Sequence, residues 1–125
     1  MKIPGKTFVV TGGGNGIGRE VVLQLLAGGA RVAALDLSQE GLDETAAMAK
    51  SDKLSIHQVN IADLSQVTTS KVAVNAAHGM VDGIINVAGI IQPFVRVNDL
   101  TFDQIKKVMD VNFYGLLHVT KTYLP

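Results

Sequence analysis

The chain has 125 residues, which allows one domain long enough to bury roughly two-thirds of its unfolded surface. Eleven Lys and Arg residues balance eleven Asp and Glu residues, which favours neither a nucleic-acid-binding surface nor an acidic tail. The lack of cysteine excludes disulfides, thiol catalysis and thiolate-bound metal. No N-terminal stretch is typical of a signal peptide, and no apolar run could span a bilayer, so we expect a soluble, cytoplasmic protein that binds neither nucleic acid nor membrane.

The first predicted elements are a strand over residues 6–11, a glycine-rich turn, and a helix from residue 16 to about residue 27. The helical pattern places four apolar side chains on one face, those of Ile17, Val21, Val22 and Leu25. Closely spaced glycines let the backbone approach a bulky anion, and the new helix offers unpaired N–H groups and the positive end of its dipole. Such a turn suits a pyrophosphate.

Three interpretations of this turn compete. The dinucleotide fingerprint G-x-G-x-x-G does not occur in the chain. A P-loop almost occurs over residues 13–18, but Arg19 and Glu20 replace its Lys and Ser/Thr, which makes NTP hydrolysis a poor fit. A third glycine pattern, T-G-x-x-x-G-x-G, does occur, over residues 11–18. The alternative is an ordinary strand-to-helix turn with surplus glycine and no ligand.

A second strand is predicted over residues 31–36, and it ends in the carboxylate of Asp36. Ser38 is then placed to cap the next helix, which completes a βαβ unit. In dinucleotide sites, an acid about 20 residues after the glycine turn binds the adenosine ribose hydroxyls. Asp36 has this spacing, although it could also be only a turn acid before Ser38.

The surroundings of Asp36 indicate which dinucleotide would fit. A carboxylate repels a 2′-phosphate, and neither Asn15 nor Leu37, which flank the position, is basic. The nearest guanidinium groups belong to Arg19 and Arg31, and Arg31 lies at the far end of its strand. The sequence therefore predicts NAD in preference to NADP.

The remaining elements follow in order: a strand over 54–59, a helix over 65–78, a fully buried central strand within 81–91, a loop over 92–100 and a long helix over 101–124. Thr101 and Gln104 form the capping box that opens the last helix. Its expected core stripe contains Ile105, Val108, Met109, Leu116, Val119 and Tyr123. Asn112 falls within that stripe, and a buried amide must be satisfied or it costs about 1–3 kcal/mol.

Taken together, Thr11 to Gly18, Asp36, Asp63, Asn86-Val87-Ala88-Gly89 and Val111-Asn112-Phe113-Tyr114-Gly115 resemble the motifs of the short-chain dehydrogenase/reductase family. The resemblance implies an α/β fold, a Rossmann-type doubly wound parallel sheet in strand order 3-2-1-4, cut off after the fourth strand and its helix. It covers essentially the whole chain but only the first half of the family's fold. Residues 1–125 are therefore expected to be a single, incomplete NAD-binding domain.

The resemblance also implies the cofactor contacts, which we assign to Thr11, Gly12, Gly14, Asn15, Gly16, Ile17, Gly18, Asp36, Leu37, Asp63, Leu64, Asn86, Ala88 and Gly89. Asp63 would hydrogen-bond the adenine, although it could equally cap the following helix. The nicotinamide ribose would lie close to the backbone of residues 86–89. The alternative is that these small residues only allow a buried strand to turn. Val87 stands where the family usually has a second Asn, which puts that residue's hydrogen bonds in doubt.

In the family, the Asn of the V-N-x-x-G motif kinks its helix and holds a water in the proton relay of the catalytic lysine. The resemblance gives this catalytic role to Asn112, with a satisfied core amide as the alternative. In the family this helix also pairs with its copy in another subunit. A homo-oligomer through residues 101–124 is therefore expected, although a broad core stripe would explain the apolar residues nearly as well.

Hydride transfer in the family requires a Ser on the next strand and a Tyr-x-x-x-Lys on the next helix. Neither occurs in this sequence, where Tyr114 is followed four residues later by His118 and only two residues follow Tyr123. We therefore expect the parent function to be NAD-dependent oxidation of a secondary alcohol or reduction of a ketone, with this chain inactive alone. The alternatives are a non-catalytic NAD-binding module and an inactive, non-binding fragment. No metal site is expected, because the three histidines lack metal-ligand spacing.

Overall fold

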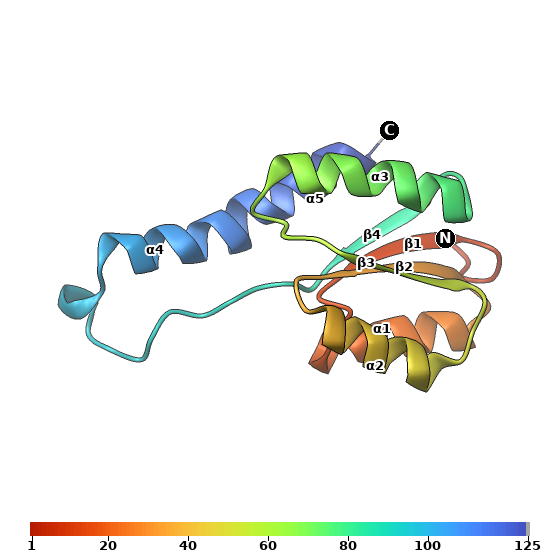
Figure 1. Ribbon diagram of the computed structural model, residues 1–125, viewed down its shortest axis with the longest axis horizontal. Coiled ribbons are helices and arrows are strands. Elements are labelled where there is room, and N and C mark those ends of the chain that lie inside the picture. The colour runs from red at the N-terminus through yellow and green to blue at the C-terminus, as the bar shows by residue number, and fades with distance from the viewer. Residues whose placement is uncertain (125) are drawn as a thin grey trace.

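Four parallel strands form the sheet of this protein in the order β3-β2-β1-β4 (Figure 1). The computed structural model describes residues 1–124. Its elements are β1 (Thr7–Thr11), α1 (Gly16–Ala27), β2 (Arg31–Asp36), α2 (Gln39–Ala49), β3 (Leu54–Gln58), α3 (Leu64–His78), β4 (Gly83–Asn86), the 3₁₀ turn η1 (Val97–Asp99), α4 (Phe102–Met109), the π-helical segment η2 (Asp110–Gly115) and α5 (Leu116–Tyr123). The predicted fold class and strand order are confirmed.

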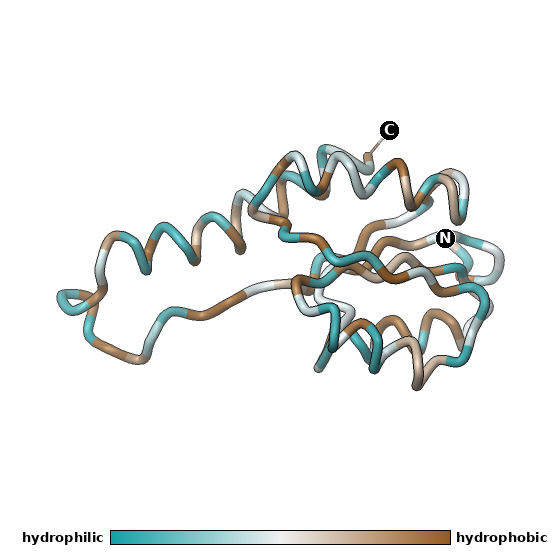
Figure 2. The backbone as a smooth tube through the Cα atoms, in the orientation of Figure 1, coloured by the Kyte–Doolittle hydropathy of each residue, from teal (hydrophilic) through white to brown (hydrophobic). Residues whose placement is uncertain are grey.

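Helices cover both faces of the sheet, with α1 and α2 on one face and α3 and α5 on the other (Figure 1). Successive strand residues point to opposite faces, so each strand supplies both layers. In β1, Phe8 and Val10 pack toward α1 and α2, whereas Val9 packs toward α3 and α5. Figure 2 shows the resulting hydrophobic stretches along the strands between the two helical layers.

Side-chain caps begin three of the helices. Ser38 accepts a hydrogen bond from the Gly41 N–H at the start of α2, and Asp63 accepts two at the start of α3. Thr101 and Gln104 form the predicted capping box of α4, with both reciprocal hydrogen bonds present. These caps satisfy N–H groups that have no partner within the helix.

The strand predicted within residues 81–91 is shorter and less buried than expected. Only Gly83–Asn86 is a strand, and the side chains of Ile84 and Ile85 are half-buried rather than fully buried. The reason is topological: within residues 1–124, β4 pairs with β1 alone and has no strand on its other side. After Asn86 the backbone leaves the sheet.

The long helix predicted over residues 101–124 is also different in the structure. It consists of α4, η2 and α5, and α4 projects away from the sheet (Figure 1). The expected core stripe is therefore buried only in α5, at Val119 and Tyr123, while Ile105, Met109 and Leu116 are exposed. The buried Tyr123 hydroxyl lies 2.7 Å from Ser70 Oγ of α3, and burial raises the pKa of Tyr123.

Two of the histidines, which show no motif spacing in the sequence, are brought together by the fold. The Oγ atom of Ser55 lies 2.7 Å from His57 Nε2 and 2.7 Å from His78 Nε2. On the far side of the His78 ring, Arg31 Nε donates to Nδ1 over 3.4 Å. Burial, and then the charge of the neighbouring His78, lowers the pKa of His57, and burial followed by the charge of Arg31 lowers the pKa of His78.

This histidine pair predicts an acid-sensitive stability. Because both folded pKa values lie below the unfolded value of 6.5, the folded state binds fewer protons than the unfolded state. We expect the free energy of unfolding to be highest above pH 6.5 and to fall as the pH drops from there through the lowered pKa values. Urea unfolding at a series of pH values measures this dependence.

Replacing both rings, in His57→Asn with His78→Asn, should flatten the dependence over this pH range. Ser70→Ala is the matched control, since it removes a buried hydrogen bond but no group that titrates there. It should lower stability about equally at each pH. An unchanged slope in the double histidine variant would contradict the prediction.

Candidate functional site

A cleft of about 410 Å³ lies at the carboxyl ends of the strands. It contains eight of the predicted contact residues, namely Gly12, Asn15, Ile17, Gly18, Asp36, Leu37, Ala88 and Gly89. Its other lining residues, which the sequence did not single out as contacts, are Leu35, Val59, Asn60, Ile61, Val87, Ile90 and Val111. In open α/β sheets, this edge is where ligands bind.

The glycine turn is packed so closely at Gly12 and Gly18 that these two positions exclude a side chain. Gly12 has a φ of +74°, and a Cβ there would lie 3.0 Å from the backbone N of Ala88. A Cβ on Gly18 would overlap the carbonyl oxygen of Gly12. The turn is thus held between α1 and the segment that follows β4, and these glycines are needed for close approach.

The N-terminus of α1 opens into the cleft without a side-chain cap. Asn15 occupies the N-cap position, but its side chain makes no capping hydrogen bond. Ile17, one of the predicted cofactor contacts, is 75% exposed and lines the cleft. The first N–H groups of a helix have no intrahelical partner, so this end can bind an anion.

Asp36 joins the end of β2 to the glycine turn. Its Oδ2 accepts a hydrogen bond from the Gly14 N–H over 2.8 Å, and its Oδ1 accepts one from the Ser38 N–H over 2.9 Å. A carboxylate has about four acceptor positions, so two remain for a ligand in the cleft that Asp36 lines. The hydrogen bond from Ser38 shows that Asp36 also stabilises the turn after β2, which was the alternative to ribose binding. The two roles are compatible, because they use different acceptor positions of the carboxylate.

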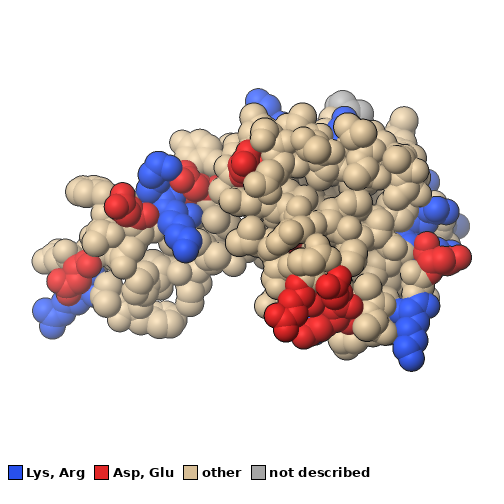
Figure 3. Space-filling view, in the orientation of Figure 1, with Lys and Arg blue, Asp and Glu red and all other residues tan. Residues whose placement is uncertain are grey.

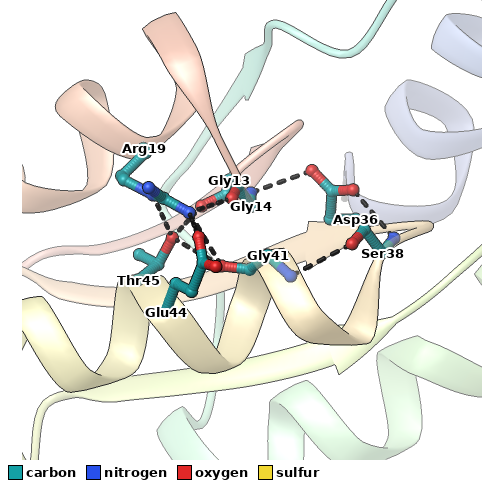
Figure 4. A network of polar contacts seen from close by, with 8 residues as sticks. All are labelled: Gly13, Gly14, Arg19, Asp36, Ser38, Gly41, Glu44 and Thr45. Carbon is teal, nitrogen blue, oxygen red and sulfur yellow. Dashed lines mark hydrogen bonds and ion pairs between the residues drawn. The ribbon is translucent and has the colours of Figure 1, made fainter.

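The two arginines nearest to Asp36 in sequence are both engaged elsewhere. The Arg19 guanidinium turns onto α2, where it forms an ion pair with Glu44 over 3.0 Å (Figure 4). Arg31 begins β2, so it lies at the amino ends of the strands, away from the cleft, and it donates a hydrogen bond to His78. Acidic side chains gather over α2 in Figure 3, and this helix carries Glu40, Asp43 and Glu44.

Two predicted contacts, Thr11 and Asn86, take structural positions outside the cleft lining. The buried Thr11 hydroxyl accepts hydrogen bonds from the N–H groups of Val87 and Ala88, both over 3.1 Å. The Asn86 amide donates to Thr120 of α5 over 3.3 Å. Thr11 therefore fixes the path of the segment after β4.

Asn112 lies in η2, where the helix widens, and holds that same segment from the other side. Its Oδ1 accepts from the Ile90 N–H over 2.8 Å, and its Nδ2 donates to the Ile90 carbonyl over 2.7 Å. Both ends of the amide are satisfied, although its side chain is exposed rather than buried in a core stripe. A role in a water relay remains a prediction.

Asp63 and Leu64 do not line the cleft, and Asn60 and Ile61, in the segment that follows β3, line it instead. Asp63 caps α3, as the alternative proposed, and hydrogen bonds from Ser65 and Gln66 lower its pKa. A contact between Asp63 and adenine remains a prediction. The position of Asn60, directly after the strand predicted over residues 54–59, is the signal that could have identified it.

Comparison with known proteins identifies the class. Residues 6–125 match the family described as short chain dehydrogenase, and the chain belongs to that family. Among individual relatives, it is 35% identical over 113 residues to 2,5-dichloro-2,5-cyclohexadiene-1,4-diol dehydrogenase of Sphingobium indicum, covering 90% of this chain and 45% of that protein. It is 31% identical to 2-dehydro-3-deoxy-L-rhamnonate dehydrogenase (NAD(+)) of a Sphingomonas species, covering 97% of this chain and 48% of that protein.

Solved structures agree with the fold. A putative short-chain dehydrogenase from Novosphingobium aromaticivorans superposes with a TM-score of 0.91 at 28% identity, over 98% of this chain and 45% of that chain. NAD⁺-bound xylitol dehydrogenase superposes with a TM-score of 0.92 at 28% identity, over 98% of this chain and 48% of that chain. The chain thus spans about half the length of the relatives that it matches.

The part of the chain that the structure describes contains neither a group of metal ligands nor a membrane-spanning helix. Within residues 1–124, no three His, Cys, Asp or Glu side chains are grouped so that they could hold a metal ion. In the same part of the chain, no helix has both the length and the apolar character needed to cross a bilayer.

The packing of the glycine turn predicts unequal effects of two alanine substitutions. Gly18→Ala should cost about 3 kcal/mol of folding free energy, because its Cβ overlaps the Gly12 carbonyl. Gly16→Ala should cost only about 1 kcal/mol, from its φ of +53°, since a Cβ there meets no atom within 4 Å. Denaturant unfolding without cofactor measures both, and equal losses would contradict the assignment.

Proposed function

We propose that this chain is the NAD(H)-binding part of a cytoplasmic short-chain oxidoreductase that oxidises a secondary alcohol or reduces a ketone. The single observation that carries the proposal is the cleft in which Asp36 and the uncapped N-terminus of α1 lie together. A dinucleotide needs acceptors for its ribose hydroxyls and donors for its pyrophosphate, and these two groups supply them. When bound, the nicotinamide supplies hydride chemistry that no side chain provides.

Each part of the cleft has a role in this proposal. The pyrophosphate binds at the glycine turn and the first N–H groups of α1, and the adenosine ribose binds at Asp36. The nicotinamide ribose passes Ala88 and Gly89, where the absence of large side chains leaves room. Thr11 and Asn112 act as positioning residues, since their hydrogen bonds hold the backbone from Val87 to Ile90.

The charges around Asp36 support NAD over NADP. A 2′-phosphate would approach the Asp36 carboxylate, and within residues 1–124 no Lys or Arg lines the cleft to neutralise it. The Arg19 guanidinium is paired with Glu44 on α2. Repulsion between like charges a few ångströms apart is worth about 1–4 kcal/mol near a protein surface.

This preference is tested by competition between AMP and 2′,5′-ADP, which differ only in the 2′-phosphate. We expect AMP to bind at least about tenfold more tightly, which corresponds to about 1.4 kcal/mol of repulsion. Asp36→Asn removes the charge and should bring the Kd values of AMP and 2′,5′-ADP closer together. Asp43→Asn, on the solvent side of α2, should leave the ratio of these two Kd values unchanged. Tighter binding of 2′,5′-ADP by the unmodified protein would overturn the proposal of NAD.

Hydride transfer is a separate question from binding. Because residues 1–125 contain no Tyr-x-x-x-Lys, we propose that this chain alone binds NAD(H) without turnover. Purified chain mixed with NAD⁺ and a panel of secondary alcohols should show no alcohol-dependent NADH absorbance. Such absorbance, reduced by Asn112→Ala, would overturn this part of the proposal, and failure to bind NADH at all would favour an inactive fragment.

The projecting helix supports a further proposal, a homo-oligomer through residues 101–124. Its exposed apolar side chains include Phe102, Ile105, Met109, Phe113 and Leu116. Exposed apolar side chains along one helical arm are typical of an interaction surface. A second copy of the same helix would present the same apolar residues, as a two-fold interface requires.

Sedimentation of the full-length protein tests the oligomer. We expect a dimer or larger assembly that dissociates when Phe102→Asp and Phe113→Asp are combined, because two buried charges would then lack partners. Val72→Asp, on the exposed side of α3, is the matched control and should leave the assembly intact. A monomer in the unmodified protein would contradict the proposal.

A further inference from the structure

A polar network joins the glycine turn to the end of β2 and to α2 (Figure 4). At its centre, Arg19 Nε donates to Thr45 Oγ1 over 2.9 Å. Arg19 Nη2 donates to the carbonyl oxygens of Gly14 and Gly41 and to the Glu44 carboxylate. The guanidinium suits this arrangement because it presents several donors in a rigid plane.

Thr45 is fully buried and connects Arg19 to the turn. Its Oγ1 lies 2.7 Å from the Gly13 carbonyl oxygen, to which it donates, while it accepts from Arg19. Gly41 lets α2 approach this closely, since a Cβ there would lie 2.6 Å from the Gly14 carbonyl oxygen. The carbonyl groups of Gly13 and Gly14 are therefore both directed toward α2.

Because a peptide unit is planar, a contact that fixes the direction of its carbonyl group also fixes the direction of its N–H group. In a trans peptide unit the C=O of one residue and the N–H of the next point in opposite directions, and residues 1–124 contain no cis peptide bond. Thr45 holds the Gly13 carbonyl, and Asp36 accepts from the Gly14 N–H of the same peptide unit over 2.8 Å. The Gly13–Gly14 peptide unit is therefore hydrogen-bonded through both its carbonyl and its N–H group.

The next peptide unit is held by a side chain at its carbonyl group. Arg19 binds the Gly14 carbonyl, so the Asn15 N–H of the same unit points away from α2. Asn15 itself lines the cleft. The contacts on α2 thus determine both where Asp36 is anchored and how the Asn15 N–H is directed.

We propose that Arg19 and Thr45 are positioning residues for the dinucleotide, orienting the Gly13–Gly14 and Gly14–Asn15 peptide units for the ribose and the pyrophosphate. This inference rests on the proposed binding of NAD(H). Neither side chain lines the cleft, so both act through the backbone of the turn and through Asp36. Preorganised donors bind more tightly than mobile ones because less ordering entropy is lost on binding.

The test measures the Kd of NADH and of ADP-ribose, by calorimetry, for variants of the full-length protein. Thr45→Val removes the hydroxyl at nearly constant shape, and Arg19→Lys keeps the charge but loses the planar fork. Each should raise both Kd values by about tenfold and by equal factors, which corresponds to about one hydrogen bond. The factors should be equal because ADP-ribose contains every group that the turn contacts.

Two controls separate positioning from a loss of stability. Ser70→Ala removes a buried hydrogen bond between α3 and α5, so it should lower stability without raising either Kd. In an Asp36→Ala background, Thr45→Val should raise the Kd by a smaller factor than in the unmodified protein, because both residues grip the same peptide unit. Additive effects would overturn the inference.

The outcomes also distinguish the inference from the function on which it rests. If the unmodified protein binds neither NADH nor ADP-ribose, the proposed function fails. If it binds both, and Thr45→Val and Arg19→Lys bind them equally well, the positioning inference is overturned while the function stands. Weakened binding by Ser70→Ala to the same extent as by Thr45→Val would likewise overturn the inference.

Discussion

The close approach of three backbone segments is the constraint on which this structure depends. The glycine turn, the start of α1 and the segment after β4 meet so tightly that a Cβ on Gly18 would overlap the Gly12 carbonyl. The Thr11 hydroxyl joins the ends of β1 and β4 at the same place. The cleft lies where these segments meet, and Gly12, Gly18 and Ala88 are part of its lining.

Several side chains around this cleft form hydrogen bonds with backbone groups and so fix the path of the backbone. Asp36 and Thr45 hold the glycine turn from opposite sides, and Asn112 holds the Ile90 peptide groups. Each of these contacts satisfies backbone groups and fixes their direction in one step. Backbone N–H groups held in this way can bind an anion without the reorganisation that flexible side chains would require.

Much of the local structure was predictable because its causes are local. The capping box of Thr101 and Gln104 forms with the predicted residues, and Asp36 lies at the predicted strand end, about 20 residues after the turn. The strand order followed from resemblance and from the handedness of crossovers, rather than from any local pattern. Burial was predicted less well, since Ile105 and Met109 belong to the expected core stripe and are nevertheless exposed.

The sequence by itself determined the element order, the caps and the composition of the glycine turn, because these depend on residues within a few positions of one another. Only the tertiary structure decided the partners across the fold. Arg19 meets Thr45 across 26 positions, Ser70 meets Tyr123 across 53, and the two histidines meet at Ser55. No periodicity encodes such pairs, because they depend on how helices are set against the sheet after each has formed.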